Sequence, residues 1–477
     1  MKITLFALNG TWAHSALGVR CVADALRETG YSPVVIEGNL QDRTLTLLQR
    51  LYETDADVYG FSCYIWNVDE TLQLAQMLKE LRPGAHIFLG GPEVSFASER
   101  FTELSFVDHV IAGEGEVAAV ELVRALERGG TPPALLCGTP DPRFEERGIH
   151  YAKNDTVPAL VYYESSRGCP FSCAFCLSSA THGVRAKSAE RTLEDLLAFE
   201  GLEGRFTVKL VDRTFNFDKE RAKKIWRGLL SPVYTKCYHF EIAAHLLDEE
   251  CFDILSRFPA GKIRVEIGLQ STNPHTLTAV SRHTDARAVL EASARLVRDG
   301  GCHVHLDLIA GLPHEDMESF ARSFDAAYFC CHVLQLGFLK MLHGTALREH
   351  AADFGAVFDK KAPYTVLKTD TLSFDDVLRL HAVSDLMERL RDSTRFARTL
   401  SLITEHVDSP FAFYSELAEY LTRASGKVLQ KISQRDLFAY VATFSRRVLS
   451  CELHEALSEA MRADFSAAEC RRPPKGI

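Results

Sequence analysis

The chain has 477 residues, which is too long for one ordinary domain, so we expect two or three. Its 46% hydrophobic and 25% charged residues are typical of a globular protein and exclude an intrinsically disordered one. The 64 acidic and 54 basic residues give a net charge of −10, which argues against a large nucleic-acid interface. No apolar run approaches the roughly 20 residues of a membrane helix, and the first residues predict a strand rather than a cleaved leader. We therefore expect a cytoplasmic protein without membrane contact.

Residues 1–127 alternate short apolar runs with amphipathic, helix-like segments. Runs such as ITLFAL and HIFLGG are continuously apolar, as expected of parallel strands that are covered on both faces. Five such units predict a doubly wound, Rossmann-like α/β domain. The next stretch, residues 128–157, is rich in Gly and Pro and predicts a connector, with a short hairpin over residues 148–153.

A second alternating series occupies residues 158–345. Its six strand-like runs, separated by helical segments, predict a partial (β/α)6 barrel with its site at the carboxyl ends of the strands. Over residues 346–477 the strand pattern fades and predicts a helical C-terminal domain, which we expect to cover the barrel mouth and select the substrate. The six runs are LVYYESS, FTVKLVD, YHFEIAA, KIRVEIGLQ, HVHLDLIAG and VLQLGFLKML.

Three cysteines stand apart from the others because they follow directly on the first strand of the second series. Cys169, Cys173 and Cys176 form a C-x3-C-x2-C array in the segment ESSRGCPFSCAFCLSS. Structural zinc usually has four ligands, and no matching pair of ligands follows. Three thiolates on a [4Fe–4S] cluster instead leave one iron open for a small ligand. The array therefore predicts a cluster, and the remaining cysteines are expected to be buried free thiols.

This spacing, with Phe175 just before the third cysteine, resembles the signature of the radical S-adenosylmethionine (SAM) superfamily. In that family the amino and carboxylate groups of SAM bind the open iron, and one electron from the cluster cleaves the sulfonium. The segments VDRTFN, YHFEI, EIGLQSTN, DLIAGLPHE and GFLKML resemble the family's further SAM-binding motifs. Besides Phe175, the resemblance implies that SAM is bound by Asp212, Glu241, Gln270, Ser271, Ile309, Gly311 and Phe338.

The loops expected at the carboxyl ends of the first sheet include SCYIWN, LGGPEVS and AGEGE. No GxGxxG follows the first strand, so a nicotinamide or flavin site is disfavoured. The loops resemble those of the cobalamin-binding domain that precedes a large subgroup of radical SAM proteins, whose C-terminal helical domain is uncharacterised. The resemblance implies a cobalamin site lined by Ser62, Gly90, Gly91, Pro92, Glu93, Gly113 and Glu114.

One segment departs from the pattern of cobalamin domains that supply a histidine to cobalt. Those domains carry D-x-H-x-x-G, whereas this chain has Trp12 in place of the Asp and Gly18 one position late around His14. A ligating histidine normally needs a partner that orients its ring. We therefore expect His14 to line the site or cap its helix rather than to bind cobalt. Tyr64 or Trp66 is the alternative cover for the lower face of the cobalt.

Taken together, the motifs predict a cobalamin-dependent radical SAM enzyme, and the resemblance implies methyl transfer to a small-molecule substrate. An external one-electron donor of the flavodoxin or ferredoxin type is expected. Ring closure or rearrangement with the same cofactors is an alternative. A radical SAM enzyme that modifies RNA is a second alternative, but the net charge of −10 disfavours it. A non-catalytic sensor is a third. The substrate itself is not readable from the sequence.

Overall fold

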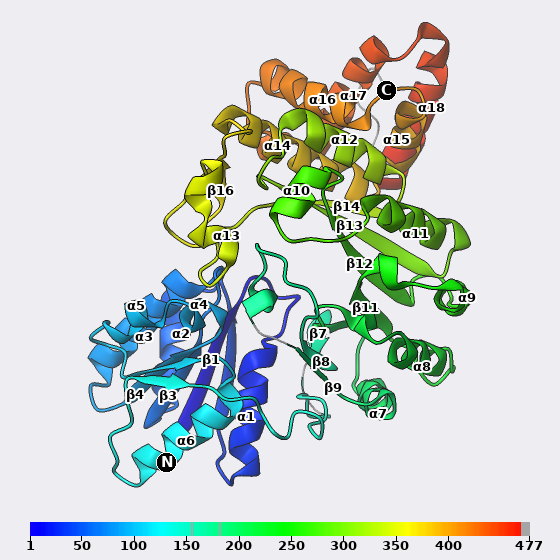
Figure 1. The fold of residues 1–477 in the computed structure, drawn as a ribbon. Coiled ribbons are helices and arrows are strands. Elements are labelled where there is room, and N and C mark those ends of the chain that lie inside the picture. Colours follow the sequence, from blue (N-terminus) through cyan, green and yellow to red (C-terminus); the bar gives the residue numbers. More distant parts are fainter. Residues whose placement is uncertain (154, 156, 181–182, 469–477) are drawn as a thin grey trace.

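The computed structural model describes residues 1–153, 155, 157–180 and 183–468. Three regions follow one another along the chain, and the first residues lie at the opposite end of the molecule from the last described helix, which ends at residue 468 (Figure 1). Among the described residues, no helix combines the length and the apolar composition that crossing a bilayer requires.

The first region contains a six-stranded, all-parallel sheet in the order β2-β1-β3-β4-β5-β6. One hydrophobic core lies on each of its faces, so the predicted doubly wound α/β architecture is confirmed. The strands are β1 (Ile3–Asn9), β2 (Val34–Asn39), β3 (Val58–Ser62), β4 (His86–Gly90), β5 (His109–Ala112) and β6 (Leu135–Cys137). The helices are α1 (Leu17–Glu28), α2 (Thr44–Glu53), α3 (Val68–Leu81), α4 (Pro92–Ser95), α5 (Ser98–Thr102) and α6 (Gly115–Glu127).

The segment expected to be a connector, residues 128–157, is more ordered than its composition suggests. Its residues 135–137 form the edge strand β6, which pairs in parallel with β5. The hairpin expected over residues 148–153 does not form, because these residues are in no strand of the structure. They lie instead against α1, where His150 Nδ1 is 2.6 Å from a carboxylate oxygen of Asp24.

The second region contains another six-stranded, all-parallel sheet, in the order β14-β13-β12-β11-β10-β7. The two edge strands do not pair with each other, so the barrel is partial, as predicted. The strands are β7 (Leu160–Tyr163), β10 (Thr207–Leu210), β11 (Cys237–Ile242), β12 (Ile263–Gln270), β13 (Cys302–Ala310) and β14 (Val333–Phe338). The helices are α7 (Ala189–Glu200), α8 (Lys219–Leu229), α9 (Glu249–Ser256), α10 (Pro274–Ala279), α11 (Ala286–Asp299) and α12 (Met317–Tyr328).

A small antiparallel hairpin, which the sequence analysis did not anticipate, stands beside this sheet. Its strands are β8 (Ser166–Gly168) and β9 (Val184–Ala186), and the predicted cluster cysteines lie on the loop between them. Gly168 has φ of 102°, and a Cβ on this residue would lie 2.1 Å from the carbonyl oxygen of Gly183. Only glycine therefore permits the close approach of the two strands at the base of the loop.

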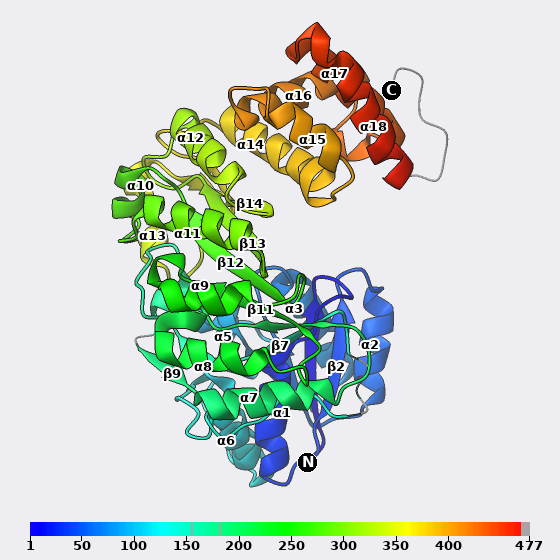
Figure 2. The ribbon, with the colours of Figure 1, turned by 90° about the vertical axis from the view of Figure 1, so that its right-hand side faces the viewer.

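The C-terminal region is helical, as predicted, and its helices pack against α12. They continue the outer helical layer beyond β14 (Figure 2) and share one core with it. The hydroxyl groups of Tyr328 on α12 and Tyr414 on α16 lie 3.0 Å apart. The region contains α13 (Ala346–Glu349), β15 (Val357–Phe358), β16 (Val366–Lys368), α14 (Phe374–Leu386), α15 (Ala397–Thr404), α16 (Pro410–Ser425), α17 (Gln434–Val448) and α18 (His454–Ala468).

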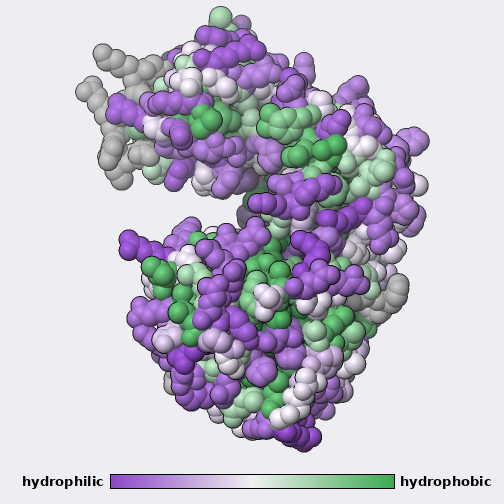
Figure 3. Space-filling view, turned by 90° about the vertical axis from the view of Figure 1, so that its left-hand side faces the viewer, coloured by the Kyte–Doolittle hydropathy of each residue, from purple (hydrophilic) through white to green (hydrophobic). Residues whose placement is uncertain are grey.

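The segment of residues 345–368, at the start of the predicted C-terminal domain, lies next to the predicted site. Leu347, Phe354 and Val366 share a core with side chains from the cysteine loop and from the carboxyl ends of β13 and β14. A notch separates the C-terminal helices from the first region on the face drawn in Figure 3. The expectation that the C-terminal region covers the barrel mouth and selects the substrate stays a prediction.

Candidate functional site

The three predicted cluster ligands, Cys169, Cys173 and Cys176, lie on one loop that follows β7 and β8. The loop is tied down between the second and third cysteine. The backbone N–H of Ala174 donates to Val280 O at 2.9 Å, and the N–H of Leu347 donates to Ala174 O at 3.0 Å. Two separate segments of the chain therefore fix the spacing of the thiols.

The surroundings of the thiols suit anionic sulfur. Arg282 donates from Nη1 to Cys173 Sγ at 3.5 Å, and Thr214 Oγ1 lies 3.6 Å from Cys169 Sγ. Burial raises the pKa of the Cys173 thiol, and the Arg282 guanidinium acts in the opposite direction. Arg282 is held in place because its other amino group donates to the backbone carbonyl of Gly268.

These residues fit a [4Fe–4S] cluster better than a single ion. No group of three His, Cys, Asp or Glu side chains in the described part of the chain is placed to hold one metal ion. A cubane needs no such convergence, because each thiolate binds a different iron. The three thiols lie on one loop that backbone hydrogen bonds hold in place, and the Arg282 guanidinium lies beside them. They supply the donor set of a cluster with one open iron.

Asp212, predicted to contact SAM, lies just after β10. Its side chain is fully buried, and it accepts hydrogen bonds from Ser165 Oγ at 2.9 Å and from the hydroxyl of Ser166. Burial raises its pKa to about 6. The carboxyl group ties the end of β10 to the segment that leads into the cysteine loop, and its contact with SAM stays a prediction.

Apart from Phe175, which lies on the cysteine loop, the other predicted SAM residues lie on the inner face of the sheet or where its strands end. Gln270 ends β12 in a left-handed conformation with φ of 71°, and its buried Oε1 has no hydrogen-bond partner among the described residues. Ser271 is fully buried and accepts from Asn273 N at 2.9 Å. An unpartnered buried acceptor is unfavourable in the protein alone, so the Gln270 carbonyl is available to a donor on a ligand.

Aromatic and small residues occupy the neighbouring strand ends. The ring of Phe338, at the end of β14, stacks on the imidazole of His381 from α14 with a centroid separation of 3.5 Å. Gly311 has φ of 90°, and a Cβ there would lie 2.4 Å from Val366. Ile309 and Phe175 pack against the core formed with the segment of residues 345–368. The predicted adenine-binding side is therefore built partly from residues that follow the barrel.

The inner face of the second sheet is polar. Along β13 buried residues alternate with partly exposed ones, and the buried set packs under the helices. On the inner face Lys209 Nζ lies 2.8 Å from Glu266 Oε2 and 3.7 Å from Glu241 Oε1. Burial raises the pKa of Glu241 to about 7 and that of Asp307 well above its usual range. It lowers the pKa of His305 to about 3.

The first region contributes to the same space. His14, in the loop after β1, lies with Nδ1 2.6 Å from the hydroxyl of Tyr162 on β7. The N–H of Leu160 donates to Ala13 O at 2.8 Å. His14 does not cap α1, because the N-cap of that helix is Ala16. These contacts place the loop after β1 against β7, at the edge of the barrel.

Two aromatic residues stand at the carboxyl end of β3. Tyr64 and Trp66 stack with ring centroids 4.3 Å apart, and Trp66 is 49% exposed. Gly91, next to them, has φ of 108°, and a Cβ there would lie 2.6 Å from Cys63 O. The exposed ring of Trp66, supported by Tyr64 and beside close-approaching backbone, is a surface on which a flat macrocycle can lie. Ser62, Gly90, Pro92 and Gly113 complete this edge of the sheet.

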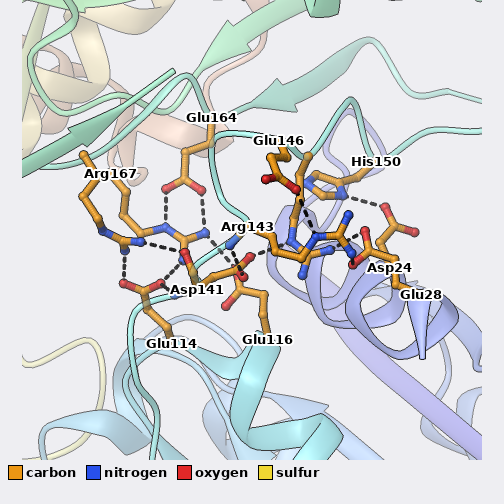
Figure 4. Close-up of polar contacts among 12 residues, drawn as sticks. Asp24, Glu28, Glu114, Glu116, Asp141, Arg143, Glu146, His150, Glu164 and Arg167 are labelled. Carbon is orange, nitrogen blue, oxygen red and sulfur yellow. Dashed lines mark hydrogen bonds and ion pairs between the residues drawn. The ribbon is translucent and has the colours of Figure 1, made fainter. Parts of the chain in front are cut away.

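Two of the predicted cobalamin-lining residues have partners in the barrel half. Glu93 is 4% exposed and accepts from the hydroxyl of Tyr364. Glu114 is paired with Arg167 and Arg185, which belong to β8 and β9 (Figure 4). Both carboxylates therefore connect the first region to later parts of the chain, and their place along the corrin stays a prediction.

The sequence analysis missed the polar residues of the inner face and the arginines of the hairpin. Three of the missed residues, Glu266, His305 and Asp307, share one signal, because the runs VEIGLQ and HVHLDLIA alternate polar and apolar residues. This alternation marks a sheet that is covered by helices on one face only. The missed residues are Arg167, Arg185, Lys209, Thr214, His239, Glu266, Arg282, His305 and Asp307.

Three family models match successive parts of the chain. They are the B12 binding domain over residues 8–123, the radical SAM superfamily over residues 163–327, and a protein of unknown function, DUF4080, over residues 352–477. The chain belongs to the cobalamin-dependent radical SAM family. In this radical SAM enzyme, cobalamin is assigned to the first region, and the [4Fe–4S] cluster and SAM are assigned to the second.

Known proteins resemble this radical SAM enzyme over much of its length. An uncharacterised methyltransferase of Pyrococcus horikoshii is 26% identical over 344 residues, 65% of this chain and 74% of that protein. The 2-(S-pantetheinyl)-carbapenam-3-carboxylate methyltransferase of Streptantibioticus cattleyicolor is 27% identical, and the match covers 56% of this chain but 44% of that protein. The structure of OxsB, a cobalamin-dependent SAM radical enzyme, matches 99% of this chain and 82% of that chain with a TM-score of 0.66 at 15% identity, which shows a shared fold.

Proposed function

We propose that this enzyme transfers a methyl group to an unactivated centre of a small polar molecule, with SAM as the methyl source and cobalamin as the carrier. The observation that carries the proposal is the contact of His14 with Tyr162, because it brings the cobalamin half against the barrel edge beside the polar inner face. Substrate, cluster loop and cobalamin domain would then meet in one space. The two curated relatives described above are both methyltransferases.

When bound, the cofactors supply one-electron cleavage of SAM and a transferable methyl group. The residues of the chain hold the cofactors and the substrate in position. Cys169, Cys173 and Cys176 hold the cluster, and the Gln270 carbonyl accepts a hydrogen bond from a ligand amino or hydroxyl group. The segment of residues 345–368 packs over the cysteine loop and excludes water from it.

The carboxyl groups of the inner face are suited to hold a proton next to a substrate. Glu241 has a pKa of about 7, and burial favours the protonated form of Asp307, so each can donate a hydrogen bond near neutral pH. The buried Oδ1 of Asp307 has no partner among the described residues, so it can accept a second hydrogen bond. Such an inner face fits a substrate with several polar groups better than a hydrocarbon.

The electron that starts the reaction would come from an external flavodoxin or ferredoxin. A cytoplasmic location suits such a donor and is part of the proposal. A nucleic-acid substrate is disfavoured by the net charge of −10. Ring closure or rearrangement would use the same cofactors, so the test below distinguishes it by product.

The test begins with anaerobic expression in the presence of cobalamin, followed by metal analysis. We expect about one cobalt and about four irons per chain. The reduced enzyme is then incubated with methyl-deuterated SAM and a metabolite extract. A metabolite that gains the deuterated methyl group supports the proposal. An isomerised or cyclised metabolite without the label would replace methyl transfer with rearrangement, and iron without cobalt would refute it.

A further inference from the structure

We propose that Glu114 of the cobalamin domain is a positioning residue that sets the cysteine loop of the barrel relative to cobalamin, through Arg167 and Arg185. The reaction readout of this inference rests on the proposed function, whereas its structural readout does not. Glu114 lies between β5 and α6, in the segment AGEGE, and its two partners lie on the two strands that frame the cysteine loop.

Both oxygens of the Glu114 carboxylate are used. Arg167 Nη1 donates to Oε2 at 2.5 Å (Figure 4), and Arg185 Nη2 donates to Oε1. Arg167 and Arg185 are direct cross-strand neighbours in the β8–β9 pair. One carboxylate therefore bridges both strands at the base of the loop, and Arg167 is separated from Cys169 by Gly168 alone.

Further contacts hold Arg167 and Arg185 in place. Arg167 also donates to Glu116 at 2.8 Å, on the first turn of α6, and to Glu164 at 2.7 Å in its own domain. The ring of Phe144 lies beside the guanidinium carbons of Arg167 and Arg185, at 5.1 and 5.4 Å from its centroid. The arginines are thus held between charged groups of both domains and an aromatic ring.

The backbone of Glu114 is equally constrained. A Cβ on Gly138 would lie 2.0 Å from Glu114 O, so only glycine lets the chain after β6 approach the backbone of Glu114 so closely. The N–H of Asp141 donates to Glu114 Oε2 at 3.0 Å. Because the carboxylate is fixed on the cobalamin side, any movement of the cobalamin domain would act on both strands below the cysteines.

The ion pair of Glu114 with Arg167 is partly buried. The side chains of Glu114 and Arg167 are 23% and 21% exposed, so the pair is partly screened from water and directional. Arginine donates through a planar fork, and its geometry matches a carboxylate that spans two strands. The same space contains Arg143 and Glu146, an exposed pair 3.2 Å apart, with Glu146 touching neither strand of the hairpin.

The experiment compares Glu114→Ala, Glu114→Asp and the control Glu146→Ala in the full chain loaded with both cofactors. The first readout is the microwave power that saturates the EPR signal of cob(II)alamin. A reduced cluster nearby speeds the relaxation of that signal, so the saturation power reports the separation of the two cofactors without any substrate. The second readout is the amount of methylated product per SAM cleaved.

We expect Glu114→Ala to keep its iron and cobalt but to saturate at lower power, with the product ratio falling on the order of 10-fold to 100-fold. Glu114→Asp should restore part of both, because the charge is kept, and Glu146→Ala should match the parent. A Glu114→Ala enzyme with unchanged saturation and ratio would overturn the inference. If that variant does not fold, the same readouts are measured on Arg185→Ala. This substitution removes one partner of Glu114 at a side chain that is 35% exposed. A parent that makes no methylated product would refute the proposed function and leave the saturation test valid.

Discussion

The two parallel sheets of this enzyme have the same number of strands but differ in how many of their faces helices cover. In the first sheet all seven residues of β1 are buried, because helices pack on both faces. In the second sheet every other residue of β13 is partly exposed, because helices pack on one face only. The first sheet can therefore bind a ligand only at its edge, whereas the second keeps a whole face for ligands.

This difference shows where polar residues on strands have a function. A lysine, three carboxyl groups and several imidazoles on the inner face of the second sheet would be costly in a core that helices cover on both faces. They are tolerated because the inner face is a site. Burial that alternates along parallel strands therefore locates the substrate space before any ligand is known.

The largest expected effect comes from matched cysteines on the two sheets. Cys173→Ala should lose the cluster and all SAM cleavage, because one of the three thiolate ligands is removed. Cys63→Ala, at the carboxyl end of β3 and fully buried, should retain about four irons per chain. Iron analysis and the EPR spectrum of the reduced protein measure both. A Cys173→Ala protein with a full complement of iron would contradict the assignment of the loop.

The next prediction concerns the free energy of unfolding. It compares substitutions of neighbouring residues on one strand of each sheet. Leu5→Ala and Phe6→Ala should each lower the free energy of unfolding by about 2–5 kcal/mol, because both faces of β1 are cores. On β13, Leu306→Ala should cost a similar amount, whereas His305→Ala should cost about 1 kcal/mol or less. Denaturant titration of the cofactor-free chains measures all four. Equal losses for Leu306 and His305 would show that the inner face is a core.

A smaller effect depends on pH. The pKa of Glu241 is raised from its ordinary value of 4.5 to about 7, so the fold binds its proton more tightly than the unfolded chain. Stability is thus lost as pH rises from about 4.5 through about 7. Glu241→Gln should be more stable than the parent above pH 7 by on the order of 1–3 kcal/mol and equal to it below pH 4.5. Thermal unfolding across this range measures the difference.

The matched control for that prediction is Glu203→Gln, an exposed carboxyl group of the same domain. It should follow the parent at every pH. If Glu241→Gln and Glu203→Gln give the same profile, burial on the inner face does not hold the proton of Glu241.

The smallest expected effect tests the contact between the two halves. Tyr162→Phe keeps the ring but removes the hydroxyl that lies 2.6 Å from His14, so it should cost about 0.5–1.5 kcal/mol. Tyr31→Phe, which removes a hydroxyl contact within the first region, is the control. The visible spectrum of bound cobalamin should change in the first variant and not in the second. If the visible spectrum changes in neither variant, His14 does not line the cobalamin site.

The sequence predicted the two sheets well because their strands are long apolar or alternating runs. It missed β6 and the β8–β9 hairpin, since each of their strands has three residues and leaves no periodic pattern. The cysteine array was readable because its ligands are close in the chain. The roles of Glu93 and Glu114 were not, because their partners lie 271 and 53 residues away. Local motifs identify which residues matter, and long-range contacts decide what they do.

The C-terminal helices have a consequence for how this family is divided. The family model of unknown function begins at residue 352, but its helices bury their apolar side chains in a core that already includes Phe324 and Tyr328 of α12. A chimera joined at residue 352 would exchange half of a core rather than a separate body. Replacing these helices would require compensating changes in α12 and β14. The C-terminal helices and the barrel therefore form one folding unit through their shared core.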